Sequence, residues 1–386
     1  MIYFDNAATS WPKPDAVRAA HNEYFADAGG NPGRSGHRMS IAAARLVEGA
    51  REYLAALFHV TDPSRIVFTH NATHALNLAL SGLLHAGDHV ITTSMEHNSV
   101  MRPLRHFEST GVQLTVIPCS GEGLLDLDQV RRAIRANTKL LVTTHASNVT
   151  GTIFPVAQLA GIARAHGVLS LIDASQTAGV IPIHIEKLAV DMLAFTGHKG
   201  LLGPTGTGGL YIRDSVPLVP LIRGGTGSAS ASETQPDFLP DAYESGTPNV
   251  VGIAGLGAAV QFLADVGVDA VMAHERKLLA RFISGALAIP EITVYGTGDA
   301  KLGCGLVSFN IAGATPSEVS LMLDESFGIL SRPGLHCAPA AHRTLGTFPT
   351  GTVRFSFSWF NTREEVDQAL SALTEIAAWA RKAMSI

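Results

Sequence analysis

Short apolar runs alternate with helical segments along residues 65–213, and this alternation limits the folds that the chain can adopt. Seven runs predict strands, at 65–70 (RIVFTH), 89–94 (HVITTS), 112–118 (VQLTVIP), 139–147 (KLLVTTHAS), 168–175 (VLSLIDAS), 191–196 (DMLAFT) and 208–213 (GGLYIR). The segments between most of them carry apolar residues at helical spacing. Continuously apolar strands are typical of a parallel sheet that helices cover on both faces. The expected fold is α/β with a mostly parallel seven-stranded sheet, which binds ligands beyond the carboxyl ends of its strands.

The remainder of the 386-residue chain predicts a second, smaller unit. An apolar stretch after residue 250 indicates a long helix. Beyond it, the runs ITVYG, GLVSFNI and TVRFSFS predict two or three strands, and helices are expected near 316–325 and 363–383. We therefore expect a large α/β domain over 15–250 and a small α+β domain over 251–386, which also takes in the N-terminal segment 1–14.

Composition excludes several classes of function. A net charge of −5 gives no basic surface for a nucleic acid. No apolar run reaches the roughly 18 residues needed to span a bilayer, and the first residues lack the pattern of a signal peptide. Sixteen histidines include no HExxH motif and no Cys/His cluster at ligand spacing, so no metal site is predicted. The expected location is the cytoplasm.

Lys199 is the residue whose placement is hardest to explain as structure alone. The apolar run MLAF leads into it, and the Gly-rich loop GLLGPTGTGG follows it. A lysine is costly to bury unless it is paired or neutral, and burial shifts its pKa toward reactivity. Lys199 is therefore a candidate reactive amine.

Other strands of the predicted sheet also end in polar residues. Thr73 opens a predicted helix, and the remaining members follow strand ends: His97, Asn148, Asp173, Gln176 and His198. Parallel strands bring such residues to one sheet edge. Pyridoxal phosphate chemistry uses this set, because it requires a lysine, a carboxylate against the pyridine nitrogen, a phosphate cup and a flat group beside the ring. Lys199, Asp173, Thr73 and His97 supply one of each.

The three cysteines differ in their surroundings. Cys119 and Cys304 adjoin apolar strands and are interpreted as inert buried thiols. Cys337 lies in SRPGLHCAPAAH, close to Arg332 and to two histidines. Cationic neighbours lower a thiol pKa, so Cys337 is a candidate nucleophile.

With these residues, the chain resembles the class V aminotransferase family of fold-type I pyridoxal phosphate enzymes. Within it, the chain is similar to the cysteine desulfurases and selenocysteine lyases that carry an RxGxHC signature. The matching stretches cover essentially the whole sequence: YFDNAATS (3–10), SMEHNSV (94–100), HASNVTGT (145–152), DASQTAG (173–179), FTGHKGLLGPTGTGGLY (195–211), ESGTPN (244–249), RPGLHC (332–337) and VRFSFSWFNT (353–362).

The resemblance implies a role for each site residue. Lys199 would hold the cofactor aldehyde, Asp173 would pair with the pyridine nitrogen, and His97 would stack on the ring. Gln176 and Asn148 would contact the phenolic side of the ring. The phosphate would lie against Ala72, Thr73, Thr196 and His198, with Thr247 reaching in from the second subunit of a homodimer. Arg354 would bind the substrate carboxylate, Cys337 would take the sulfur, and the substrate pocket would be lined by Asn6, Ala7, His37 and Arg332.

The reaction implied by the resemblance is removal of sulfur from L-cysteine, which gives L-alanine and a persulfide on Cys337 that passes to an acceptor protein. Selenocysteine lyase is the nearest alternative. A C–S lyase, an epimerase or an aminotransferase would need Lys199 but not Cys337, and an idle scaffold would need neither. The chain departs from its relatives at His74, where an acidic residue is common, at Pro333 within the signature and at Thr196, where serine is usual.

Overall fold

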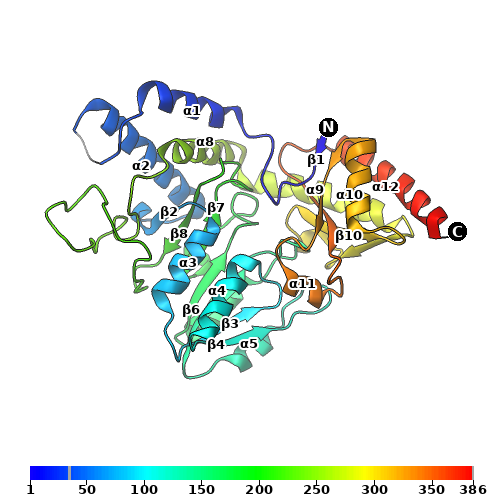
Figure 1. The fold of residues 1–386 in the computed structure, drawn as a ribbon, viewed down its shortest axis with the longest axis horizontal. Coiled ribbons are helices and arrows are strands. Elements are labelled where there is room, and N and C mark those ends of the chain that lie inside the picture. Colours follow the sequence, from blue (N-terminus) through cyan, green and yellow to red (C-terminus); the bar gives the residue numbers. More distant parts are fainter. Residues whose placement is uncertain (34–35, 385–386) are drawn as a thin grey trace.

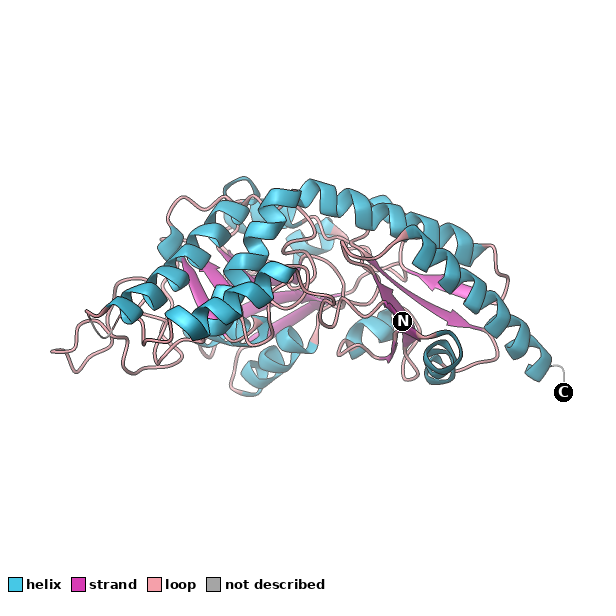
Figure 2. Cartoon of the chain, turned by 90° about the horizontal axis from the view of Figure 1, so that it is seen from above, coloured by secondary structure: helices cyan, strands magenta, loops and turns pink. Residues whose placement is uncertain are grey.

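The computed structural model describes residues 1–33 and 36–384, and it contains a large sheet, a small sheet and a short two-stranded ribbon. Helices flank both of the larger sheets and link them along one side (Figures 1 and 2). The N-terminus lies beside the small sheet, and the chain then crosses to the large one (Figure 1).

The large sheet has seven strands, as the apolar runs predicted. They are β2 (Ile66–Thr69), β3 (His89–Thr93), β4 (Gln113–Ile117), β5 (Thr138–Thr144), β6 (Leu169–Asp173), β7 (Met192–Thr196) and β8 (Gly208–Ile212). Their order across the sheet is β2-β8-β7-β6-β5-β3-β4. Only β8 runs antiparallel to its neighbours, β2 and β7, so the sheet is mostly parallel.

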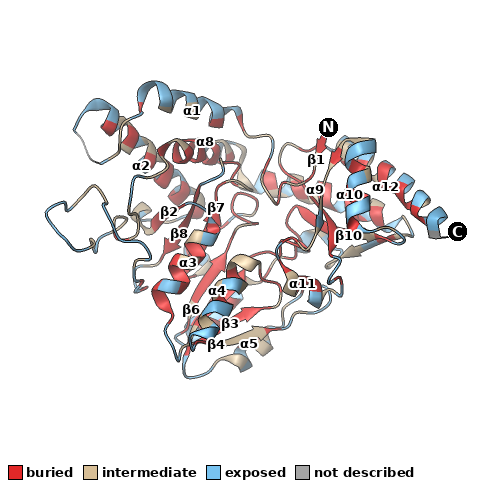
Figure 3. Ribbon diagram, in the orientation of Figure 1, coloured by how far each residue is buried: buried red, intermediate tan, exposed pale blue. Residues whose placement is uncertain are grey.

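Strand β7 shows why these runs are apolar without alternation. All five of its residues are buried. Met192 and Ala194 pack in the same core as the helices α3 (Ala72–Leu83) and α4 (Asn98–Ser109). Leu193 and Phe195 face the opposite core, which α2 (Arg38–Phe58) and α8 (Val250–Val266) fill. Both sets of alternate side chains of β7 are therefore inside the protein, and the other strands of the sheet except the edge strand β4 are buried along almost all of their length (Figure 3).

Further helices complete the two covering layers. These are α1 (Asp15–Asp27), α5 (Leu127–Ala133), α6 (Val156–Ala165) and α7 (Ile185–Leu188). Helix α8 packs closely on α2, because a Cβ added at Gly257 would lie 3.0 Å from the Cβ of Ala50. In the described part of the chain, no single helix is long and apolar enough to cross a bilayer. Helices α8 and α9 (Val268–Leu287) would reach that length only together, and their axes bend by 79°.

The small sheet is antiparallel, in the order β12-β13-β10-β9. Its strands are β9 (Ile292–Tyr295), β10 (Leu306–Ile311), β12 (Arg332–Gly334) and β13 (Thr352–Ser356). Helices α9, α10 (Pro316–Phe327) and α12 (Arg363–Met384) contribute to its core, in which Phe4, Phe282, Phe309 and Phe355 contact one another.

Five elements of this part lie outside the sequence prediction. The longest is α9, and the others are β12, the 3-10 helix Ala300–Leu302, β11 (Ile329–Leu330), which pairs in parallel with β1 (Ile2–Tyr3), and α11 (Pro339–Thr344). Helix α8 confirms the long helix predicted after residue 250, and it ends at Val266, just before Gly267, which has a φ of 86°. The division into two domains at residue 250 stays a prediction.

Candidate active site

A cavity of about 300 Å³ lies between the carboxyl ends of the large-sheet strands and the near end of the small sheet. Twelve of the predicted site residues line it: Ala7, Ala72, Thr73, His97, Asn148, Asp173, Gln176, Thr196, His198, Lys199, Arg332 and Arg354. The sheet topology therefore brings together residues that are spread over most of the sequence. Asn6, His37, Thr247 and Cys337 lie elsewhere.

Lys199 follows β7 in a tight turn. The Leu202 N–H donates to the Lys199 carbonyl at 2.8 Å, and the Gly203 N–H donates to the Gly197 carbonyl at 2.8 Å. A Cβ at Gly197 would lie 2.1 Å from the Thr207 hydroxyl, so only glycine fits there. Burial of the amine lowers the pKa of Lys199 to about 8, and the negative charge of Asp173 opposes this shift. A substantial share of the Lys199 amine is therefore neutral near pH 8.

Asp173 ends β6, the neighbouring parallel strand. Its residue partner in the register is Ala194 of β7, which lies five positions before Lys199. The Asp173 carboxylate accepts a hydrogen bond from the Ser175 N–H at 2.9 Å and another from the Ser175 hydroxyl. These bonds fix the carboxylate at the floor of the cavity and leave its other oxygen for a ligand.

The N-termini of α3 and α4 meet at the cavity through a chain of side chains. The Ser99 N–H donates to Nδ1 of His97 at 3.0 Å, so Nδ1 is an acceptor and the neutral ring carries its proton on Nε2. Ser99 Oγ lies 2.9 Å from the same Nδ1 and 2.7 Å from Thr73 Oγ1. Burial first, then the charge of Lys199, lowers the pKa of His97 to about 4. The imidazole is therefore neutral and fixed in one tautomer.

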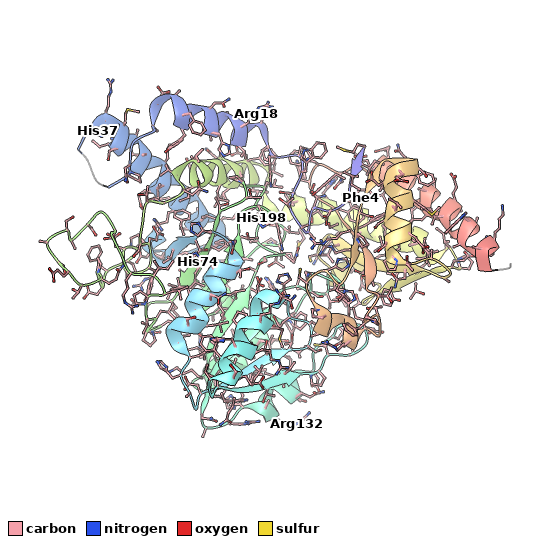
Figure 4. All side chains as sticks on the ribbon, viewed as in Figure 1. Phe4, Arg18, His37, His74, Arg132 and His198 are labelled. Carbon is pink, nitrogen blue, oxygen red and sulfur yellow. The ribbon has the colours of Figure 1, made fainter. Side chains whose placement is uncertain are left out.

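Thr73 lies in the first turn of α3, whose N-cap is Asn71; the Asn71 side chain accepts from the His74 N–H at 2.9 Å. Free N–H groups at a helix N-terminus attract anions. His198 borders the same cavity, and burial followed by the nearby charge of Lys199 lowers its pKa to about 4. Figure 4 shows His198 near the centre of the molecule and His74 on α3.

Arg354 and Arg332 supply the positive charge on the opposite side of the cavity. They are direct partners in the register of β12 and β13. Arg354 is only 2% exposed, and it donates from Nη1 to the Asn148 carbonyl and from Nη2 to Asp5 Oδ1, each at 3.0 Å. Its buried Nε has no hydrogen-bond partner within residues 1–33 and 36–384. Burial lowers the pKa of Arg354 despite the ion pair with Asp5.

Cys337 lies outside this cavity, in an adjoining groove of about 670 Å³. The groove and the cavity share Thr73, His97 and Ser99. Cys337 is exposed, and both His336 and Cys337 adopt left-handed backbone conformations, with φ of 48° and 57°. Two bonds hold this backbone: the Asn98 N–H donates to the Cys337 carbonyl at 2.8 Å, and Asn148 Nδ2 donates to the His336 carbonyl at 2.7 Å.

Three further predicted residues are placed away from the cavity. Asn6 lies behind it, where Nδ2 donates to the Ser356 carbonyl at 2.9 Å. His37 is the N-cap of α2 and is exposed. It lies far from His198, which borders the cavity (Figure 4). Thr247 is exposed and accepts from Asn31. His37 does not line the cavity of the chain to which it belongs, because the N-terminus of α2 points away from the sheet edge.

The sequence prediction did not assign Ser99, Ser175, Asp5 or His336 to the site. Ser99 and Ser175 each lie two residues after the group they orient, His97 and Asp173. That spacing is typical of short side-chain turns and was a usable signal. Asp5 and His336 could not be placed without the tertiary structure.

The fold and this cavity define an enzyme built around one half-buried lysine at the carboxyl edge of a mostly parallel sheet. A family model described as aminotransferase class-V matches residues 2–369, and the chain belongs to that family. The resemblance inferred from the motifs is thereby confirmed.

Relatives and solved structures point to one branch of the family. A probable cysteine desulfurase of Methanothermobacter thermautotrophicus is 36% identical, over 97% of this chain and 94% of the relative. A cysteine desulfurase of Enterobacter sp. is 33% identical, over 97% of this chain and 93% of the relative. The apo cysteine desulfurase of Thermococcus onnurineus superposes with a TM-score of 0.91 at 36% identity, over 98% of this chain and 94% of that one. A cysteine desulfurase of Escherichia coli gives 0.87 at 30% identity, over 97% and 94%.

Proposed function

We propose that this protein is a pyridoxal phosphate-dependent cysteine desulfurase, which converts L-cysteine to L-alanine and leaves the sulfur as a persulfide on Cys337. The observation that carries this proposal is the position of the Cys337 groove, which adjoins the lysine cavity and shares His97 with it. A family enzyme that did not transfer sulfur would have no need of a thiol there. The relatives named cysteine desulfurase support the same conclusion.

The residues present fit pyridoxal phosphate. The cavity combines an amine, a carboxylate and a helix N-terminus with a hydroxyl group, which suit an aldehyde, a pyridine nitrogen and a phosphate. Four buried polar atoms of its lining have no partner in the described structure: Asn148 Oδ1, His198 Nδ1, His336 Nδ1 and Arg354 Nε. Orphaned buried groups are costly, so their presence indicates that the cavity is built to hold a polar ligand.

Within this proposal, Lys199 would hold the cofactor, Asp173 would pair with its pyridine nitrogen, and its phosphate would be held by Ala72, Thr73, Thr196 and His198. His97 would lie against the ring, and Asn148 and Gln176 would contact its phenolic side. When bound, pyridoxal phosphate stores the electron pair that remains on the substrate after the α-proton leaves.

The chain's own groups then carry out binding and proton transfer. Arg354 and Arg332 bind the substrate carboxylate, which fixes the orientation of the amino acid. Lys199 accepts the α-proton on Nζ, for which its pKa of about 8 is suited. His97 stays neutral and cannot compete for this proton, because its pKa is about 4.

Sulfur transfer requires Cys337 to turn from the groove toward the cavity. Its thiolate attacks the sulfur of the substrate, the substrate C–S bond breaks, and the new S–S bond forms on Cys337. The carbon that loses sulfur takes up a proton and becomes a methyl group, and Lys199 returns a proton to the α-carbon, which completes L-alanine. Burial raises the pKa of Cys119 to about 11 and that of Cys304 to about 12, so neither competes as a nucleophile.

We also propose a homodimer. His37 and Thr247 are exposed, and a short network connects them: the Ser40 N–H donates to His37, Ser40 Oγ donates to the Asn31 carbonyl, and Asn31 Nδ2 donates to Thr247. Two predicted site residues thus share one surface away from their own cavity. A second copy that received this surface at its cavity would complete both sites, and a separate acceptor protein would collect the sulfur.

The test is mass spectrometry of the cofactor-loaded protein after incubation with L-cysteine. We expect one added sulfur atom mapped to Cys337, and release of L-alanine. Cys337→Ser should lower this activity by roughly 100-fold or more while leaving the cofactor bound, and Lys199→Ala should abolish both. Cys119→Ser is the matched control and should behave like the native protein.

Several results would contradict the proposal. Alanine release without sulfur on Cys337 would indicate a C–S lyase. Turnover of L-selenocysteine with no turnover of L-cysteine would identify a selenocysteine lyase. Absence of either product from a cofactor-loaded protein would exclude desulfuration.

A further inference from the structure

One backbone carbonyl beside Lys199 accepts an unusual number of hydrogen bonds. The carbonyl oxygen of His198 receives four donors: the Ser10 N–H at 2.9 Å, the Lys13 ammonium at 3.0 Å, the Ser10 hydroxyl at 3.1 Å and the Thr9 hydroxyl at 3.2 Å. This oxygen belongs to the peptide bond that joins His198 to Lys199. A carbonyl oxygen has two lone pairs, so one or two donors would be enough to satisfy it, and this oxygen has four.

Lys13 is the unexpected member of this group. It is partly buried, and burial lowers its pKa to about 8. Within the described residues it makes no salt bridge; its partners are neutral oxygens, the His198 carbonyl and Ser10 Oγ at 2.7 Å. Withdrawing an ammonium from water without an acidic partner is costly. The hydrogen bond from the Lys13 ammonium to the His198 carbonyl offsets part of this cost, because a charged donor makes a stronger hydrogen bond than a neutral one.

The segment that carries these donors is itself held firmly. The Tyr3 hydroxyl donates to the Thr9 carbonyl at 2.9 Å, and the Trp11 N–H donates to Asn6 Oδ1 at 3.2 Å. The Asn6 side chain is in turn bonded to β13 through the Ser356 carbonyl. Residues 3–13 therefore form a fixed bridge from the small sheet to the lysine turn, at the crossing visible in Figure 1.

We propose that Thr9, Ser10 and Lys13, here called the N-terminal clamp, position Lys199 by holding the peptide bond that precedes it. On its other side, Lys199 is held by the turn to Leu202. The backbone is thus fixed on both sides, while the side chain stays free to move. In the proposed function, on which this inference rests, Lys199 must release the cofactor and then meet the α-proton, and both acts require a fixed starting point.

The clamp is tested by comparing Lys13→Met with Lys13→Arg, which retains a cationic donor. The first readout is amide hydrogen exchange of the cofactor-free protein. Lys13→Met should accelerate exchange of Ser10, Leu202 and Gly203, and Lys13→Arg should restore much of the protection. The second readout is turnover of L-cysteine, in which Lys13→Met should lower kcat by roughly 10- to 100-fold with little change in KM.

The controls separate this role from general stability. Lys382→Met, at an exposed position on α12, should change neither readout. Ser10→Ala removes the hydroxyl donor and keeps the Ser10 N–H bond to the His198 carbonyl. It should lower kcat by less than the factor expected for Lys13→Met. It also tests the clamp if Lys13→Met does not fold. Native exchange and native kcat in a folded Lys13→Met protein would overturn the proposal. So would equal losses in Lys13→Met and Lys13→Arg that simply follow a fall in Tm.

The two claims fail separately. Hydrogen exchange is measured without cofactor or substrate, so it does not depend on which reaction the protein performs. If L-cysteine is not a substrate and the exchange pattern holds, the proposed reaction is wrong and the clamp remains.

Discussion

At the scale of single residues, burial in the cavity favours the neutral forms of its lysine and histidine side chains. Burial lowers the pKa of Lys199 to about 8 and those of His97 and His198 to about 4, so the three nitrogen bases nearest the ligand position are partly or wholly neutral at physiological pH. The fixed positive charge is left to Arg354 and Arg332. This division separates the groups that hold an anion from the groups that move a proton.

A titration of Lys199 tests this division. In the cofactor-free protein, competitive acetylation of Lys199 should rise with pH around a midpoint near 8, whereas an ordinary exposed lysine titrates near roughly 10.4. Asp173→Asn should lower the midpoint, because the negative charge of Asp173 raises the pKa of Lys199. Mass spectrometry of the peptide that contains Lys199 gives the midpoint. A midpoint equal to that of a free lysine derivative would show that the amine is solvated.

At the scale of elements, the site depends on how strand ends are joined. Glu96 is fully buried just after β3, and its carboxyl group bonds the Thr144 N–H at 2.9 Å and the Thr93 hydroxyl at 2.6 Å. It thereby ties the end of β3 to the end of β5, immediately before His97 and Asn148. Burial raises the pKa of Glu96 to about 8, so it is mainly protonated at neutral pH and resembles an amide in charge.

Two substitutions at Glu96 should therefore differ sharply. Glu96→Gln keeps an acceptor and the volume of the side chain, so it should cost less than about 1 kcal/mol of unfolding free energy. Glu96→Ala leaves the Thr144 N–H unpaired and opens a cavity, so it should cost about 2–4 kcal/mol. Urea unfolding of the cofactor-free variants measures both. Equal losses would mean that the ionised carboxylate, and not the hydrogen bond, holds the strands together.

The same elements show how far the sequence could be read. Strands β2 to β8, apart from the edge strand β4, are buried on both faces and largely apolar, so their runs and their common edge were predictable, and with them most of the residues that line the cavity. Strand β12 (RPG) has no apolar pattern and pairs only through its register with β13, so the meeting of Arg332 and Arg354 could not be derived from periodicity. The groove position of Cys337 and the outward position of His37 depend on loops, whose paths no local pattern determines.

At the scale of the whole molecule, buried and half-buried histidines are distributed through both halves of the fold. Burial lowers the pKa of eight of them: His89, His97, His145, His198 and His342 to about 4, His336 to about 2, and His74 and His184 below the ordinary value. The unfolded chain binds protons on these residues near roughly pH 6.5, and the folded protein does not. Folding is therefore penalised as the medium becomes acidic, well before the carboxylates titrate.

We expect the Tm of the cofactor-free protein to fall as pH decreases from about 6.5 to about 4. Protons stabilise whichever state binds them, and in this range the unfolded state binds more. Glu96 and Glu275 act in the opposite sense, because their raised pKa values favour the folded state at low pH, but the histidines outnumber them. Calorimetry across this range measures the slope.

His89 provides the matched variant. Its ring nitrogens lie 2.8 Å from the hydroxyls of Thr138 and Thr115, on the strands to either side of β3. His89→Gln retains hydrogen-bonding groups but cannot titrate, so it should make the pH dependence shallower. A Tm that stays constant between pH 6.5 and 4 would contradict this account of the buried histidines.

The separation of the Cys337 groove from the lysine cavity affects how the two products are released. In a desulfurase built this way, alanine leaves from the cavity while the sulfur departs from the outer groove. In such an enzyme the two products would not share an exit, so an acceptor seated over Cys337 would not block the next amino acid from entering. Unloading of one turnover can then overlap with loading of the following one.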